Sequence, residues 1–192
     1  MLLTCTPGAS GTLKEAMERS ELSADQLGEV LSIVSGMSSD FHITEMLSTL
    51  VRSGTLDASK RRQYLNATGE IDSDFHRAEA LKALLQNGAP AAEEMALLMS
   101  TITALDSDHH KGEVLGRLLD IKTLREADLL RVQLAAQTID SDFSESEILR
   151  RIAGHAAATQ TVKDAVYDAA GSLSSHYRDE VRRAVRRSDG AA

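Results

Sequence analysis

Histidine and aspartate residues are densest in the segment Asp106-Ser107-Asp108-His109-His110. Imidazole nitrogens and carboxylate oxygens are donor types that bind zinc and other transition metals. If this segment opens a helix, however, adjacent side chains point about 100° apart, which works against joint coordination by the two histidines. The sequence therefore predicts no metal site and no cofactor.

Asp-Ser-Asp occurs three times, at 72–74, 106–108 and 140–142. A calcium-binding loop of the EF-hand type also needs a third oxygen position, a glycine and a distal glutamate, and none of these stretches supplies that set. A serine hydroxyl can accept from N–H groups of a first helical turn, and an aspartate beside it favours the positive helix end. We therefore predict that these residues, with the matching pair upstream, are helix caps: Ser39, Asp40, Ser73, Asp74, Ser107, Asp108, Ser141 and Asp142.

The predicted caps belong to a segment that recurs at a constant spacing. Its aspartates stand at positions 40, 74, 108 and 142, a step of 34, and a fifth, altered copy begins at Leu173. A period of 34 residues falls in the range of repeats built from two helices. We expect a first helix of each repeat (helix A) at about 23–36, 57–70, 91–104, 125–138 and 159–172. The second helix (helix B) is expected at about 39–53, 73–87, 107–120, 141–155 and 175–188.

This pattern predicts an all-α fold, because each helix pair buries one face internally and needs a neighbour to cover the other. We expect an α-solenoid of antiparallel helix pairs, wound as a right-handed superhelix, with HEAT-like or tetratricopeptide-like shape. Residues 1–192 would form one domain. It would comprise an N-terminal half-repeat at 3–19, repeats at 22–53, 56–87, 90–120 and 124–155, and a capping repeat at 158–188.

Two further positions recur in the B helices. One holds a ring in every copy, and we expect it to form a wedge between repeats in the core; the alternative is a ridge that faces a ligand. Its residues are Phe41, Phe75, His109, Phe143 and Tyr177. The other position is a glutamate, which either pairs with the neighbouring repeat and fixes the angle between repeats, or lies on solvated surface. Its residues are Glu45, Glu79, Glu113 and Glu147.

Composition argues against several classes of function. The formal net charge is −8 and the sequence pI about 5.2, which disfavours binding to nucleic-acid phosphates or to anionic lipid. No apolar run approaches the roughly 18 residues of a membrane span. Cys5 is the only cysteine, so no disulfide framework and no cysteine-based zinc site is expected.

The best-preserved copy resembles a known family of repeats. Leu65-Asn66-Ala67, Ile71-Asp72-Ser73-Asp74-Phe75 and Glu79-Ala80-Leu81 are similar to helical repeats in bacteria, C-terminal to membrane-embedded zinc peptidases of the BlaR/MecR type and in related sensor-like proteins. The resemblance covers roughly residues 22–185. It implies a non-catalytic, extracytoplasmic sensing or protein-binding extension; without it, the cytoplasm would be the expected compartment. The peptidase motif is absent, so no protease activity carries over.

The sequence contains no recognisable arrangement of a nucleophile and a general base. Paired carboxylates are present, but they recur in every copy, whereas a catalytic site normally occurs once in a chain. We therefore expect that the chain is not an enzyme but a scaffold whose concave face binds a protein or a peptide. The candidate binding residues are a histidine ridge and arginines of the A helices: His42, His76, His110, Arg61, Arg62, Arg125 and Arg131. The alternatives are a structural or self-assembling spacer of a larger sensor or membrane-peptidase protein and, through the arginines of residues 178–187, a nucleic-acid-binding HEAT-like protein.

Overall fold

The computed structural model describes residues 24–53 and 56–189, and this part of the chain is helical throughout, without a β-strand. The prediction of an all-α fold is confirmed. The expected half-repeat at 3–19 and Cys5 lie outside the described residues. The chain divides into two compact units, residues 1–97 and 98–192, and each is described below by itself.

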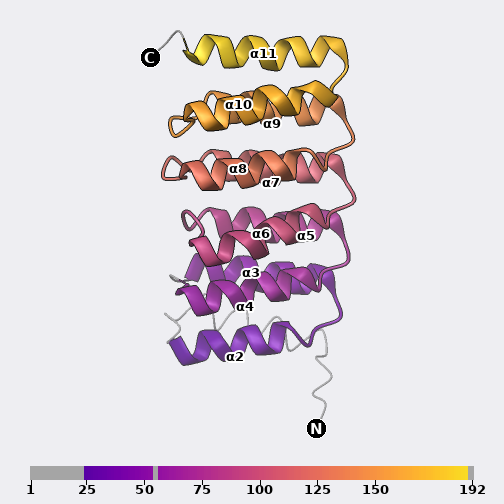
Figure 1. Cartoon of the computed structure of the whole chain (residues 1–192). Helices are drawn as coiled ribbons and strands as arrows, with labels where there is room; N and C mark the ends of the chain where they lie inside the picture. Colours follow the sequence, from indigo (N-terminus) through magenta and orange to yellow (C-terminus); the bar gives the residue numbers. More distant parts are fainter. Residues whose placement is uncertain (1–23, 54–55, 190–192) are drawn as a thin grey trace. The chain divides into compact units, whose positions relative to one another are not determined.

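Regular helices, most of them 11 or 12 residues long, make up the described part of the chain (Figure 1). Unit 1 contains α2 (Ala24–Val34), α3 (Asp40–Ser53), α4 (Ala58–Gly69) and α5 (Asp74–Leu85). Helix α6 (Ala92–Thr103) begins in unit 1 and ends in unit 2. Unit 2 contains α7 (Asp108–Leu119), α8 (Glu126–Ala136), α9 (Asp142–Ala153), α10 (Gln160–Ala169), the short 3-10 helix η1 (Ala170–Ser172) and α11 (Ser175–Asp189).

Within each unit, a helix contacts its neighbour in sequence and also the helix two places further along (Figure 1). In unit 1, α2 packs on α3 and α4, and α3 packs on α4 and α5. In unit 2, α8 packs on α10, while α9 packs on α7 and α11. In each unit, A helices therefore contact A helices and B helices contact B helices.

The core follows from the apolar stripe of the B helices. Residues three apart lie on one helical face, and the pairs Leu47 and Leu50, Leu81 and Leu84, Leu115 and Leu118, and Leu149 and Ile152 are all buried. Four apolar residues that stand two positions before the serine are buried as well: Ile71, Leu105, Ile139 and Leu173. Tyr64 joins α4 to α5: its hydroxyl donates to the carbonyl of Ala80 at 2.8 Å, and burial raises the pKa of the phenol.

The serines of the recurring segment cap their own helices. Ser73, Ser107 and Ser141 have extended backbone, and their side chains accept from the N–H groups of His76, His110 and Ser144. Each hydroxyl thereby satisfies an N–H of the first turn that has no partner within the helix.

The aspartates of the same segment bond to the following repeat. Asp40 accepts from the backbone N–H of Ser73 at 2.8 Å, and Asp108 accepts from those of Asp140 and Ser141 at 3.2 and 2.9 Å. Asp142 accepts from the N–H of Ser174 at 3.0 Å, and hydrogen bonds from Ser174 lower the pKa of Asp142. These carboxylates thus connect successive repeats, a function that the capping prediction did not include.

Among the described residues, no helix combines the length and the apolar composition needed to cross a membrane.

Candidate functional site

The ring position of the B helices faces solvent. Phe41, Phe75 and Phe143 are 57%, 54% and 58% exposed, and they are all the phenylalanines in the chain. The expectation of a buried wedge is therefore wrong at these three positions. The alternative, a ridge on the surface, describes them correctly.

Helix geometry explains the exposure. The ring stands six residues before the buried leucine of the stripe, as Phe75 does before Leu81. At about 100° per residue, six residues place it about 120° away around the helix from the buried face. The apolar residue that fills the core at this end is the one that precedes the cap, such as Ile71, which is fully buried.

In unit 1 the exposed rings contact histidines. The ring centroid of Phe41 lies 5.4 Å from that of His42 and 6.2 Å from that of His76 in the next repeat, both in edge-on geometry. Phe75 contacts His76 in the same way at 5.2 Å. The predicted histidine ridge is thus part of an aromatic surface on the first turns of α3 and α5. We call these residues, with their counterparts in unit 2, the ring ridge.

Unit 2, taken by itself, shows the same kind of ring contact. Phe143 lies edge-on to Tyr177 of the following repeat, with centroids 6.2 Å apart, and His109 lies 5.2 Å from His110. In both units, therefore, the ring of one repeat contacts an aromatic side chain of the next.

Exposed acidic residues stand close in sequence to the exposed rings. Asp72 and Asp140 are exposed in the turns before α5 and α9, three residues before Phe75 and Phe143. The ridge therefore combines apolar ring faces with negative charge. Such a surface favours lysine and arginine side chains, whose cations bind over aromatic rings and pair with carboxylates.

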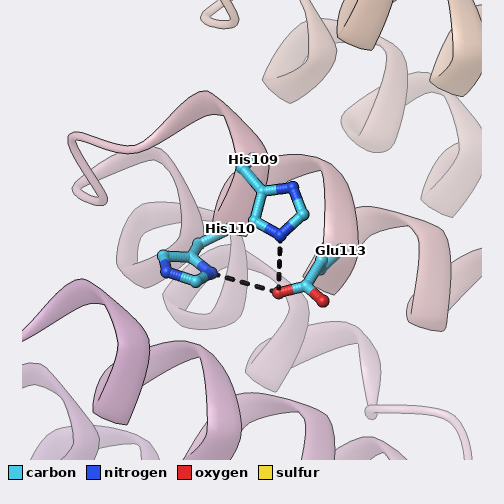
Figure 2. Close-up of side chains that lie close together, drawn as sticks. All are labelled: His109, His110 and Glu113. Carbon is cyan, nitrogen blue, oxygen red and sulfur yellow. Dashed lines mark hydrogen bonds and ion pairs between the residues drawn. The ribbon is translucent and has the colours of Figure 1, made fainter.

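Figure 2 shows a cluster of two histidines and a glutamate on the first turns of α7. Glu113 Oε2 lies 3.1 Å from His110 Nδ1 and 3.8 Å from His109 Nε2, and one donor atom from each residue falls within 4.8 Å of the others. Among the described residues, this is the group of three that could hold a metal ion. Sequence reasoning considered Asp106 and Asp108 as partners of the histidines and missed Glu113, although its spacing of three and four residues was a usable signal.

Two of the recurring glutamates pair within their own helices. Glu79 forms an ion pair with Lys82 at 2.6 Å, and Glu147 pairs with Arg150, in each case one turn further along. The hypothesis that these two glutamates pair with the neighbouring repeat is therefore wrong. Aspartates of the caps do form bonds between repeats.

The four arginines predicted to bind a partner lie in different environments. Arg61 is buried and its Nε donates to Glu94 Oε2 at 2.9 Å, whereas Arg62 is exposed. Arg125 and Arg131 both pair with Asp128, at 3.1 and 3.5 Å. The predicted exposure of Arg61 is wrong, because the same position of the next two repeats is in the core and holds the buried residues Met95 and Leu129.

Glu145, in the first turn of α9, is buried, and its Oε1 has no hydrogen-bond partner. Burial, with a smaller contribution from the nearby charge of Asp142, raises the pKa of Glu145 from 4.5 to about 7. Sequence reasoning missed this residue, since its counterparts in the two preceding repeats are the cations Arg77 and Lys111.

No family model matches the chain, and no curated protein or solved structure is similar enough to it to count as a match.

Proposed function

We propose that the chain is a non-enzymatic binding module whose partner is a protein segment containing lysine or arginine next to apolar side chains. The single observation that carries this proposal is the placement of all three phenylalanines at one repeat position, each more than half exposed. Exposed aromatic groups that recur at one repeat position are typical of interaction sites, because aromatic residues dominate the energetic centres of interfaces.

An α-solenoid is the architecture that would make such a ridge useful. Support for it comes from the 34-residue spacing of the caps and from the contacts of A helices with A helices and of B helices with B helices in each unit. We infer antiparallel helix pairs in a right-handed superhelix, with one ring on each B helix. Each repeat would then offer one subsite to an extended partner.

The chemistry of the ridge selects the partner. Phe75 and Phe143 offer ring faces, and Asp72 and Asp140 offer exposed carboxylates close by in sequence. The whole chain carries a net charge of −8, which adds long-range attraction for a basic partner. Of the four arginines first considered, three are held by internal ion pairs, so an acidic partner is less well matched.

Selection from a random peptide library displayed on phage tests this proposal. The wild-type chain should enrich peptides that contain lysine or arginine beside leucine, phenylalanine or similar side chains. The variant F41A/F75A/F143A should lose them, because truncating a central aromatic anchor costs about 2 kcal/mol or more of binding free energy. The control I33A/L134A removes two other exposed apolar side chains and should retain them.

Two results would contradict the proposal. One is enrichment of acidic peptides by the wild-type chain. The other is a set of enriched peptides that the ring variant binds as tightly as the wild type does. Circular dichroism of each variant establishes that its helices are intact before binding is compared.

A further inference from the structure

We propose that His109, His110 and Glu113 bind a divalent transition-metal ion of the zinc type. The donors are His109 Nε2, His110 Nδ1 and a carboxylate oxygen of Glu113 (Figure 2). This site uses two histidines of the ring ridge, but it needs no phenylalanine and no second chain.

The donor separations fit one ion. Ligand atoms of a tetrahedral zinc ion with bonds of about 2.0–2.1 Å lie about 3.3 Å apart. The distances from Glu113 Oε2 to the two histidine nitrogens, 3.1 and 3.8 Å, lie on either side of that value. All three donors already fall within 4.8 Å of one another, so small side-chain rotations complete the site.

Helix geometry explains why adjacent histidines can share an ion here. At about 100° per residue, Glu113 stands about 40° around α7 from His109 and about 60° from His110, which places it between them. The objection that two adjacent histidines diverge holds for the pair alone. The glutamate, one turn later, lies between the two imidazoles and gives them a common point of contact.

Only one described repeat has this donor set. Histidine followed three residues later by glutamate also occurs at His42 and His76, but there the preceding residue is phenylalanine. In the third copy that phenylalanine is His109. Moreover, Lys82, which pairs with Glu79, corresponds to Gly116 in the third copy.

The donor types select the class of metal. Two imidazoles and one carboxylate suit zinc, copper, nickel or cobalt, whereas magnesium and calcium favour oxygen ligands alone. The side chain of His109 is 77% exposed and that of Glu113 36%, so the ion would keep at least one coordination position open to water. Three protein ligands with an open position are typical of zinc sites that are not purely structural.

Calorimetric titration with Zn²⁺ tests the proposal on the whole chain without a histidine tag. Every variant carries C5S, so that the thiol of Cys5 contributes nothing. We expect one ion per chain. In H109A, H110A and E113Q the affinity should fall by about tenfold or more, since even partners that only orient metal ligands contribute about 10- to 100-fold.

Two further variants separate this site from general histidine binding. H176A removes a histidine that lies 3.7 Å from Glu180 in the same spacing of four residues, but without a second histidine, and should leave the affinity unchanged. F75H/K82A gives the second repeat the donors of the third, and it should bind two ions per chain.

The proposal is overturned if the wild-type chain shows no saturable binding of Zn²⁺, or if H109A, H110A and E113Q bind it as the wild type does. It is also overturned if H176A loses as much affinity as H109A. F75H/K82A is judged once its circular dichroism matches that of the wild type. If it then binds no second ion, two adjacent histidines and a glutamate at these helix positions are not enough to bind the metal, and the proposal is contradicted.

Discussion

The carboxylate of Asp108 accepts the backbone N–H of Ser141, 33 residues later, at 2.9 Å. Asp40 makes the same bond to Ser73 in unit 1 at 2.8 Å. The aspartate stands at the first position of its own helix, and its acceptor atoms bond to the turn that begins the next B helix. The aspartate that recurs at this position thus places negative charge at the positive end of its own helix. At Asp40 and Asp108 its carboxylate also bonds to the following repeat.

Replacing Asp108 with alanine should weaken unit 2. The substitution leaves the N–H groups of Asp140 and Ser141 without their charged acceptor. Hydrogen bonds to charged groups contribute about 1.5–3 kcal/mol when intact, and because this one is only partly buried we expect a loss of about 1–2 kcal/mol in the free energy of unfolding. Urea denaturation followed by circular dichroism measures it. D140A, which removes an exposed carboxylate from the same turn, is the control and should change stability little; equal losses in both variants would contradict the account.

The buried pair of Arg61 and Glu94 gives a second prediction. Glu94 Oε2 accepts from Arg61 and from the backbone N–H of Ala91, while Glu94 Oε1 and Arg61 Nη2 are buried without a partner. E94Q leaves the guanidinium buried beside a neutral amide and should destabilise unit 1 by about 3–5 kcal/mol.

Removing both charges should recover most of that loss. In R61M/E94M no buried charge remains, and methionine is the natural residue at the equivalent position 95 of the next repeat. Thermal unfolding of the single and double variants measures the coupling, with R62A, at an exposed position, as control. A double variant less stable than E94Q would contradict this prediction. It would show that the ion pair contributes net stability beyond the mutual neutralisation of two buried charges.

Glu145 should make the stability of unit 2 depend on pH. Its pKa is raised from 4.5 to about 7 in the folded chain, so the folded state holds a proton that the unfolded state releases. The contribution is fully favourable below pH 4.5 and is lost as the pH rises through about 7. E145Q should therefore be more stable than the wild type at pH 8 and similar to it at pH 4.

The measurement is the midpoint of urea unfolding at several pH values between 4 and 8. E126Q, which neutralises an exposed glutamate in α8, should follow the wild-type profile. A wild-type profile identical to that of E145Q across this range would contradict the assignment.

Tyr64 provides a smaller test of the junction between α4 and α5. Y64F removes the hydrogen bond from the phenol to the carbonyl of Ala80, which is buried, and retains the ring. We expect a loss of about 1 kcal/mol in the free energy of unfolding, measured by urea denaturation. No loss would indicate that water or another group replaces the hydroxyl.

The helices and their buried stripe could be predicted because both depend on local periodicity. Leu81 and Leu84, like their counterparts in the other repeats, are three residues apart wherever the helix packs. The exposure of Phe75 differs from the predicted burial because apolar character alone does not fix which face of a helix a residue occupies, and six residues from Leu81 place Phe75 on another face. Helical geometry, applied residue by residue, would have corrected this.

Other features depend on packing that no local pattern encodes. The bond from Asp108 to the turn at Ser141 requires two repeats to be in contact. Arginine is usually a surface residue, and the partner that neutralises the buried Arg61 is Glu94, 33 residues away. The grouping of Glu113 with His109 and His110, by contrast, was available from spacing alone.

Site-specific photocrosslinking tests the proposed binding surface most directly. Phe75 or Phe143 is replaced by p-benzoylphenylalanine, and Leu134, exposed on α8, carries the same group in the control. After irradiation in the source cell, mass spectrometry identifies the captured segment. The account predicts adducts from positions 75 and 143 to a segment that contains lysine or arginine beside apolar residues, and none of these from position 134. Adducts from position 134 alone, or acidic segments captured at position 75, would contradict it.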